Sequence, residues 1–520
     1  VYTDGEVPTN IAAYHGDLRE LAARYEGFLG LYAFLAQRPK DVMLLGPGGG
    51  LDVWLALICG AKHIKGAEVN PSIPRIVRRF RNYAGPVYDF SNVDIAVAEG
   101  RSYLRRTDEK FDMIYMALTK TATTATTSMA LIESYVYTVE AFRDYYQHLK
   151  PGGVFAFVCQ ASPLLVRETL TALQALQQEG RSREEAAASL AIASAPENGP
   201  FIGPYRHLLM VFHHPLTPEQ ARKLGKLAVG WGLEPVYFPG AYEPAPLREL
   251  KQSDKTIAEL VKSWNQQWFG YGRPGLNTMP CTDDRPFVVD LTWGVPKPLQ
   301  HFLAGTAAAC FALMLLMAVF VVKSSGPRAG TWPVYFACLG VGFMLVEIVL
   351  IQVFTLYLGY PVLSLAVLLF SLLLGAGMGS LLSQRARLQA AARTVALAVG
   401  LLTVMMLALR AGAPVLFAAT LGWDVKLRSL MTLALVLPVG LVMGIPFPTG
   451  VRRAIDDEGA EVVPWLWAVN GVASVVGSAA AMACAKLLGF STTLAIGLAV
   501  YVLAAATILS ARAAVMSPGD

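Results

Sequence analysis

A glycine-rich loop near the N-terminus has the residue types and spacing of a nucleotide-binding site. An apolar run at residues 42–45 leads into this loop, a helix-like run follows, and an acid ends the next apolar run. Glycines let the backbone approach a nucleotide closely, and the acid can hold both ribose hydroxyls. A strand-to-helix turn that needs glycine only for positive φ is the alternative. The predicted nucleotide contacts are Gly46, Gly48, Gly49, Gly50, Asp52 and Glu68.

Strand-like and helix-like runs alternate around the loop, which predicts a doubly wound parallel α/β sheet of the Rossmann type. Five strands are expected at residues 42–45, 63–69, 93–98, 111–118 and 154–159. Helices are expected at residues 16–36, 51–59, 71–83, 138–149 and 164–178. A strand, a helix and a strand at 207–213, 218–231 and 234–238 suit the sixth and seventh strands of a methyltransferase-type sheet. Such a sheet binds its ligand at the carboxyl ends of the strands, where the loop lies.

Charge is distributed unevenly along the 520 residues. Apolar residues make up 54% of the chain and charged residues 16%, against about a quarter charged in soluble domains. Residues 1–300 carry ordinary charge, whereas nearly all residues from 301 onward are apolar. We therefore predict a soluble domain at 1–240, a connector at 241–300, and an all-α transmembrane domain of about seven helices at 301–512.

The expected membrane spans lie at residues 302–322, 332–358, 361–382, 395–409, 430–447, 465–487 and 492–509. Small residues spaced four apart allow close helix contact, and prolines should kink or end the fifth span. These small residues are Gly375 and Gly379, and Ser474 and Ser478; the prolines are Pro438, Pro446 and Pro448. Glu347 lies mid-span and is either a functional acid or the partner of Asn470 in a buried hydrogen bond.

Charge and metal-ligand patterns narrow the function classes. The net charge is +5, and no basic run resembles a phosphate-binding stripe, so no nucleic-acid partner is expected. The six cysteines and seven histidines are scattered without metal-ligand spacing, so no metal site is expected.

Taken together, these residues resemble the spermidine/spermine synthase (polyamine aminopropyltransferase) group of the S-adenosylmethionine-dependent transferases. The chain looks most like bacterial members fused to a multi-span membrane domain. The matching segments are residues 3–5 (N-terminal hairpin), 45–52 (cofactor loop), 67–71 (ribose-binding acid), 99–101 (adenine contact), 135–142, 149–153, 282–287 and 446–450. The resemblance implies S-adenosylmethionine or its decarboxylated form as cofactor, with Glu99 at the adenine. Because the hairpin begins so close to Val1, we expect a longer natural N-terminus.

The sequence departs from this family where the acceptor amine is held. Aminopropyl transfer needs a carboxylate that orients the amine and removes its proton, and soluble members carry two aspartates just past the fourth strand. Ala117 and Lys120 stand at those positions here, and Gly49 replaces an acid that faces the cofactor's amine. Because a lysine repels a polyamine, ordinary spermidine synthesis from putrescine is not expected.

Three interpretations remain open. In the first, the domain transfers an aminopropyl or related group to a small-molecule or lipid acceptor, and Lys120 attracts an anionic group of that acceptor. In the second, it binds a nucleotide without catalysis and regulates a transporter or scaffold; in the third, the fold persists without a ligand. Polar contacts or a base are expected from Glu133, Tyr135, Tyr137, Asp283 or Asp284. For the two tyrosines, the alternative role is packing in the hydrophobic core. For the two aspartates, it is capping of a turn or a helix. The run at 119–127 is expected to form a lid.

Orientation is a point of conflict. S-adenosylmethionine is a cytoplasmic metabolite, so we expect a multi-pass protein of the bacterial inner membrane with its soluble domain in the cytoplasm. With seven spans, however, more Lys and Arg residues lie on the side opposite that domain than on its own side. The positive-inside rule would place the domain outside. A homo-oligomer is left open.

Overall fold

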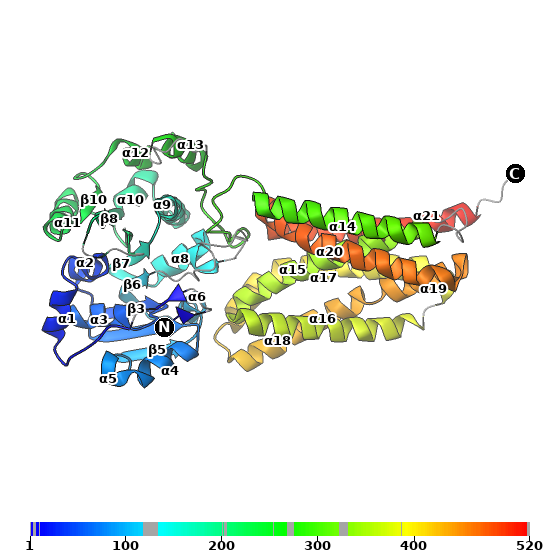
Figure 1. Ribbon diagram of the computed structural model, residues 1–520, viewed down its shortest axis with the longest axis horizontal. Coiled ribbons are helices and arrows are strands. Elements are labelled where there is room, and N and C mark those ends of the chain that lie inside the picture. The colour runs from blue at the N-terminus through cyan, green and yellow to red at the C-terminus, as the bar shows by residue number, and fades with distance from the viewer. Residues whose placement is uncertain are drawn as a thin grey trace. The chain divides into compact units, whose positions relative to one another are not determined.

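The computed structural model describes residues 2–3, 7–9, 11–117, 134–199, 201, 205–252, 254–267, 275–321, 331–385 and 387–516. The chain divides into two compact units, Val1–Trp293 and Gly294–Asp520. The first combines a sheet with covering helices, and the second consists of long helices (Figure 1). Residues 241–293, which were predicted as a connector, are counted with the first unit.

The first unit is built on an eight-stranded sheet with the order β10-β8-β9-β7-β6-β3-β4-β5. Five neighbouring strands are parallel: β7 (Leu149–Cys159), β6 (Phe111–Ala117), β3 (Asp41–Leu45), β4 (His63–Glu68) and β5 (Val93–Val97). The remaining strands, β9 (His207–Phe212), β8 (Leu190–Ser194) and β10 (Glu234–Tyr237), pair antiparallel with their neighbours. This is the predicted methyltransferase-type doubly wound sheet.

The outer part of the sheet differs from the prediction in two ways. The strands expected at 207–213 and 234–238 exist as β9 and β10, but β8 lies between them in the sheet and was not predicted. The sheet is also mixed rather than parallel throughout. Every residue of β8 is buried, and its alanines favour a helix in isolation. Burial on both faces overrides that preference, because strand propensity depends mainly on packing.

Helices cover both faces of the sheet. One core packs against α1 (Leu18–Arg24), α2 (Leu29–Gln37), α3 (Leu51–Ile58) and α11 (Pro218–Gly230). The other packs against α8 (Val139–Gln147), α9 (Ser162–Gln178), α10 (Arg183–Ala188) and α13 (Ile257–Gln267). The helix expected at 16–36 is divided into α1 and α2, with Gly27 at φ 78° between them.

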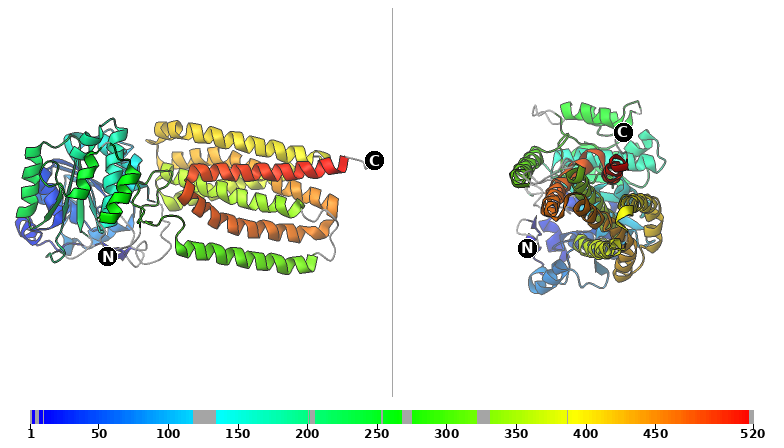
Figure 2. Two further views of the ribbon diagram at one scale, coloured as in Figure 1. Left: turned by 90° about the horizontal axis from the view of Figure 1, so that it is seen from above. Right: turned by 90° about the vertical axis from the view of Figure 1, so that its right-hand side faces the viewer.

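The second unit is a bundle of long helices (Figure 2). They are α14 (Lys297–Val321), α15 (Thr331–Leu358), α16 (Pro361–Ser383), α17 (Ala391–Thr420), α18 (Val425–Met443), α19 (Pro446–Glu458), α20 (Val463–Leu488) and α21 (Phe490–Met516). Six apolar helical segments of the described chain, from Thr331 onward, are long enough to cross a membrane. The helix α14 occupies the place of the first expected span, so a count of seven stays a prediction. The fifth span contains Pro438 and ends before Pro446, which starts α19.

Close contacts in the bundle occur at small residues. A Cβ atom on Gly379 would lie 1.9 Å from the carbonyl oxygen of Leu441, and one on Gly375 would lie 2.4 Å from that of Leu437. The predicted small-residue pair therefore brings α16 directly against α18. The side chain of Asn470 donates to the carbonyl of Phe336 at 3.0 Å. No hydrogen bond among the described residues joins it to Glu347, contrary to the predicted pairing.

Candidate functional site

The glycine loop joins β3 to α3 at the carboxyl edge of the sheet. Gly46, Gly48 and Gly50 have φ values of 72°, 54° and 92°, a region that other residues rarely adopt. A Cβ on Gly48 would also lie 2.6 Å from the Thr9 hydroxyl oxygen. The loop needs glycine both for its conformation and for its close packing.

Glu68 ends β4 beside this loop, as predicted for a ribose ligand. Its Oε2 accepts a hydrogen bond from the Gly48 N–H at 3.1 Å, and its Oε1 accepts one from the Asn70 N–H at 3.0 Å. The residue is only 7% exposed. Burial raises the pKa of its carboxyl, and the two N–H donors partly oppose that shift. A buried acid thus lies directly against the loop that a nucleotide would approach.

Two other groups fix the surroundings of the loop. Glu99 caps α6 (Gly100–Leu104) by accepting from the N–H groups of Arg101 at 2.9 Å and Ser102 at 2.7 Å. The hydroxyl of Tyr88 donates to the Gly48 carbonyl at 2.6 Å. The predicted adenine contact therefore lies at the start of α6, which follows β5 at the same edge of the sheet.

Asp52 lies in the first turn of α3 and is turned into the protein, with 5% exposure. Its Oδ1 and the Tyr115 hydroxyl are both buried without a hydrogen-bond partner among the described residues. A Cβ on Gly30 would lie 2.8 Å from that hydroxyl and 3.0 Å from Leu55, which follows Asp52 by one helical turn. Burial raises the pKa of Asp52 to about 8. An acid that holds its proton at neutral pH can donate a hydrogen bond.

An aromatic cluster lies beside this acid and consists of Tyr25, Phe28, Phe201 and Tyr205. The Phe28 ring centroid is 4.8 Å from that of Tyr205 and 5.1 Å from that of Phe201. Burial raises the pKa of Tyr205 well above its ordinary value, and the charge of Asp52 adds to the shift. Tyr205 comes just before β9, whose first residue pairs with the last residue of β7. The cluster is therefore at the carboxyl edge too.

Arg101 anchors a second group of residues at this edge. The guanidinium is 3% exposed and donates to both carboxylate oxygens of Asp283, at 2.7 and 2.9 Å, and to Asp144 at 2.6 Å. Burial alone would lower the pKa of Arg101, but the two aspartates outweigh it and hold this pKa well above its ordinary value. The Thr138 hydroxyl also donates to Asp283 at 2.7 Å. Asp283 thereby ties the turn at 282–285 to α6 and α8.

The residues predicted for catalysis fall into separate environments. Lys120, Glu133 and the expected lid at 119–127 lie outside the described residues. Tyr137 is 1% exposed and packs edge-on against Phe157, at 5.5 Å between ring centroids. The Tyr135 carbonyl accepts from Arg101 at 3.0 Å. Asp284 is partly exposed in the same turn as Asp283. Ala117 ends β6 at the edge and is buried.

Sequence reasoning missed several residues that shape the site. Arg101 was part of the matched segment 99–101, yet only its acid was assigned a role. Its bidentate partner follows 182 positions later, and no local pattern links the two. Tyr115 lies in an apolar strand and Tyr205 just precedes β9, and the sequence analysis singled out neither of them. No group of three His, Cys, Asp or Glu side chains within the described chain could hold a metal ion.

Comparisons with known proteins found one short sequence match and several solved structures that match part of the chain. No family model matches the chain. A stretch of 83 residues is 26% identical to a polyamine aminopropyltransferase of Thermoplasma acidophilum, and it covers 16% of this chain and 30% of that protein. The chain thus spans less than a third of the curated relative that it matches.

Solved structures that match part of the chain include a spermidine synthase with the transition-state analogue AdoDATO, at 17% identity and TM-score 0.28. This match covers 41% of the present chain and 71% of the spermidine synthase chain. The spermidine synthase of Thermotoga maritima is 17% identical over 40% of this chain and 70% of its own, with TM-score 0.29. Human methyltransferase-like protein 13 in complex with SAH is 16% identical over 41% of this chain and 91% of its own, with TM-score 0.28. The strand order described above defines the fold.

Proposed function

We propose that the first unit binds S-adenosylmethionine or its decarboxylated form and transfers an aminopropyl or related group to an acceptor other than putrescine. The protein would do this as a multi-pass protein of the bacterial inner membrane, with the first unit in the cytoplasm. The buried Glu68 carboxylate against the Gly48 N–H is the observation that carries the proposal. An acid held at the end of β4 beside a positive-φ glycine loop suits a ribose and its neighbouring groups.

The residues present fit such a cofactor. A carboxylate has about four lone-pair positions, so Glu68 can accept from ribose hydroxyls while it keeps both backbone donors. Gly46, Gly48, Gly49 and Gly50 provide the close backbone approach, and Glu99 lies at the start of α6 for the adenine. The cofactor supplies an electrophilic carbon next to its sulfonium. Asp52 lies in the first turn of α3, and its carboxyl group is buried.

The acceptor side of the site suits a molecule other than a polycation. Ala117 provides no carboxylate at the end of β6, and Asp52 with a pKa of about 8 carries little charge at neutral pH. Lys120 would attract an anionic group, as expected from the sequence. Tyr135, Tyr137, Asp283 and Asp284 complete the proposed set of contacts, with Asp283 acting through its ion pair to Arg101.

A catalytically inactive nucleotide-binding regulator is the second candidate. The Gly49 N–H donates to the Thr9 hydroxyl at 2.6 Å, and the N–H groups of Gly46, Gly48 and Gly50 also have acceptors within the chain. The same carboxyl edge offers no acid at Ala117. Both features suit a domain that senses a nucleotide and signals to the membrane unit.

Calorimetry of the purified full-length protein with S-adenosylmethionine, its decarboxylated form and methylthioadenosine tests the proposal. We expect binding of at least one, weakened about tenfold or more by Glu68→Gln because a charge-assisted contact is lost. Glu109→Gln is the matched control, since this exposed acid pairs with Lys65 on the surface. Absence of binding by all three would overturn the enzyme and the regulator alike.

If a nucleotide binds, mass spectrometry distinguishes the two candidates. Lipid and polyamine extracts are incubated with the protein and the bound cofactor, and the products are compared with those of Glu68→Gln. A new adduct that depends on Glu68 supports the transferase. Cofactor that stays unconsumed with every extract supports the regulator.

A further inference from the structure

A buried carboxyl group and a buried phenol meet in the first unit, where α2 and α3 pack against β6. The Oδ1 atom of Asp52 and the hydroxyl oxygen of Tyr115 are both enclosed, and neither has a hydrogen-bond partner among the described residues. Burial, and then the charge of Asp52, raises the pKa of Tyr115 well above its ordinary value, so the two groups are neighbours. Buried polar atoms without partners cost stability. A ligand that supplies the missing hydrogen bonds would remove that cost.

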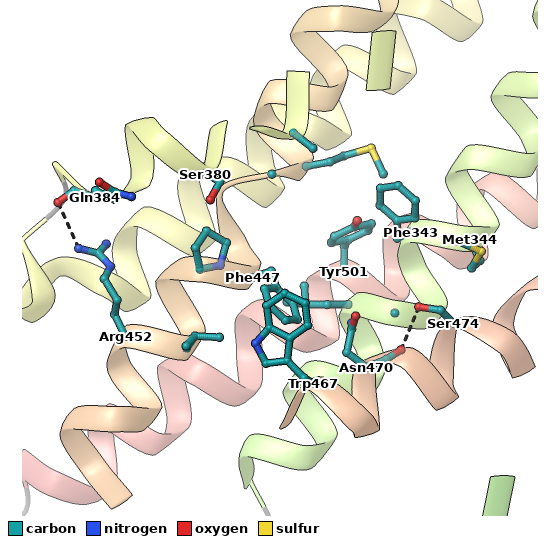
Figure 3. Close-up of a pocket in the computed structure, with 17 residues that line it drawn as sticks. Phe343, Met344, Ser380, Gln384, Phe447, Arg452, Trp467, Asn470, Ser474 and Tyr501 are labelled. Carbon is teal, nitrogen blue, oxygen red and sulfur yellow. Dashed lines mark hydrogen bonds between the residues drawn. The ribbon is translucent and has the colours of Figure 1, made fainter. Parts of the chain in front are cut away.

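In the cavity of the second unit, by contrast, polar groups bond to one another. This cavity has a volume of about 580 Å³ and is lined by side chains from α15, α16, the end of α18, α19, α20 and α21 (Figure 3). The Arg452 guanidinium donates to the Gln384 carbonyl at 3.2 Å, and the Ser474 hydroxyl donates to the Asn470 carbonyl at 2.9 Å. Since these bonds are made within the protein, they do not select a ligand. The enclosed pair in the first unit is the more specific sign of one.

Aromatic side chains lead from this pair toward solvent. A Cβ on Gly30 would lie 2.7 Å from a ring carbon of Phe28 and 2.8 Å from the Tyr115 hydroxyl, so the ring and the phenol meet at this glycine. The Phe28 ring centroid is 4.8 Å from that of Tyr205 and 5.1 Å from that of Phe201, and these two outer rings are partly exposed. Aromatic faces attract an ammonium group and pack against an apolar body. The cluster therefore suits an amine that is carried on an apolar body.

Asp52 is the acid that such an amine would meet. Burial raises its pKa to about 8, and a base whose pKa lies near the working pH accepts a proton efficiently. The titratable side chains that face it are Tyr88, Tyr115 and Tyr205, and burial raises the pKa of each well above its ordinary value. These tyrosines stay neutral at pH 8, so no second charge among these described neighbours competes for the proton. A single acid suits one amino group better than a polyamine.

We propose that Asp52 is the general base of the first unit, and that the acceptor is a primary amine on an apolar body, bound against Tyr115 and the aromatic cluster. This inference rests on the proposed transfer from the cofactor. A bond forms between the acceptor nitrogen and the electrophilic carbon, while the bond from that carbon to sulfur breaks and its electron pair neutralises the sulfonium. The proton of the acceptor nitrogen passes to the Asp52 carboxylate, and the Tyr115 hydroxyl donates to that carboxylate.

Calorimetry of the purified full-length protein with phenethylamine, in the absence of cofactor, tests the site directly. In buffers of different ionisation enthalpy, we expect binding to release about one proton at pH 7 and little at pH 9, because the ammonium group drives Asp52 to ionise. Asp52→Asn should weaken binding about tenfold or more and release no proton, because a charge-assisted contact is lost. Tyr115→Phe should weaken binding severalfold. The uncharged 2-phenylethanol has the same apolar body and should release no proton.

Asp94→Asn and Tyr83→Phe, at exposed positions, are the matched controls and should bind phenethylamine like the wild type. Binding to Asp52→Asn with wild-type affinity, or binding to the wild type without proton release at pH 7, would overturn the proposal. Absence of binding would also overturn it and would assign the enclosed pair to an ordered water molecule.

Turnover separates this proposal from the proposed function. With decarboxylated S-adenosylmethionine and phenethylamine, we expect release of methylthioadenosine, lowered about a hundredfold in Asp52→Asn, while the calorimetric affinity for the cofactor stays unchanged. If the cofactor binds and phenethylamine does not, this inference fails and the proposed function stands. If phenethylamine binds and no cofactor does, the proposed function fails, and Asp52 loses its role as a base with it.

Discussion

Asp52 is an unusual acid, because its carboxyl group is enclosed by the protein beside the Tyr115 hydroxyl, with Oδ1 unpaired among the described groups. Burial raises its pKa from 3.8 to about 8, so the folded protein holds a proton that the unfolded chain releases above pH 4. As the pH rises from about 4 to 8, the contribution of this group to the free energy of unfolding falls by about 1.4 kcal/mol for each pH unit. Above the folded pKa the loss is complete.

This proton linkage predicts the behaviour of Asp52→Asn. The amide does not titrate, so the variant should gain stability relative to the wild type as the pH rises from 5 to 8. Thermal unfolding midpoints of the full-length protein across this range measure the difference. Asp94→Asn, at an exposed position of β5, should show a constant offset. A constant difference for Asp52→Asn as well would mean that its carboxyl is not protonated in the folded state.

Arg101 allows a second test at single-residue scale. Replacement by Met removes the charge between Asp283 and Asp144, which are about four-fifths buried, and should cost about 3 kcal/mol. Hydrogen exchange should rise in residues 281–286, because their anchor is gone. Exposed Arg79→Met on α4 (Ser72–Arg79) is the control and should change neither quantity. Unchanged exchange in the turn would show that Asp283 does not hold it.

The sequence indicated the individual site residues to different degrees. Glu68 and the glycines were predictable, because a strand, a loop, a helix and an acid follow one another at a spacing set by the fold. The ion pair of Arg101 with Asp283 was not, since two distant segments meet only after the sheet has formed. Asp52 was expected at the cofactor, and its burial beside Tyr115 depends on how α2 packs over α3.

At the scale of elements, periodicity predicted the sheet well up to β7 and less well beyond it. Apolar runs mark β3 to β7, and glycine or proline lies beside several of them. The segment that forms β8 is alanine-rich and lacks such a mark, and its strand character comes from its neighbours β9 and β10.

Helix ends followed local rules: Thr217 and Gln220 form a capping box at the start of α11.

The contact of α16 with α18 predicts a contrast between two glycines on one helix. Gly379→Ala places a Cβ 1.9 Å from the Leu441 carbonyl, so the helices must separate, at a cost of about 1–3 kcal/mol. Gly377→Ala meets no atom within 4 Å and should be neutral or slightly stabilising, because alanine favours a helix. Thermal unfolding of the membrane unit in detergent measures both. Equal effects of the two substitutions would contradict the packing described for α16.

At the scale of the whole molecule, the charges of the second unit bear on its orientation. The arginine-rich loop that follows α16 holds Arg385 and Arg387 and lies at the same bundle end as the start of α15, because the two helices run antiparallel (Figure 2). The Cys310 sulfur of α14 lies 4.0 Å from the Val472 carbonyl of α20, so α14 packs along the bundle. With α14 as the predicted first span, the chain enters the membrane unit at the opposite end. A cytoplasmic first unit thus requires an exception to the positive-inside rule.

Labelling of single cysteines in intact cells tests that orientation in a variant without the six native cysteines. With the first unit in the cytoplasm, an impermeant maleimide should label Arg387→Cys from outside and should label Gly422→Cys, between α17 and α18, only after permeabilisation. The reverse pattern would place Glu68 and the glycine loop outside the cell, away from S-adenosylmethionine, and would overturn the proposed function.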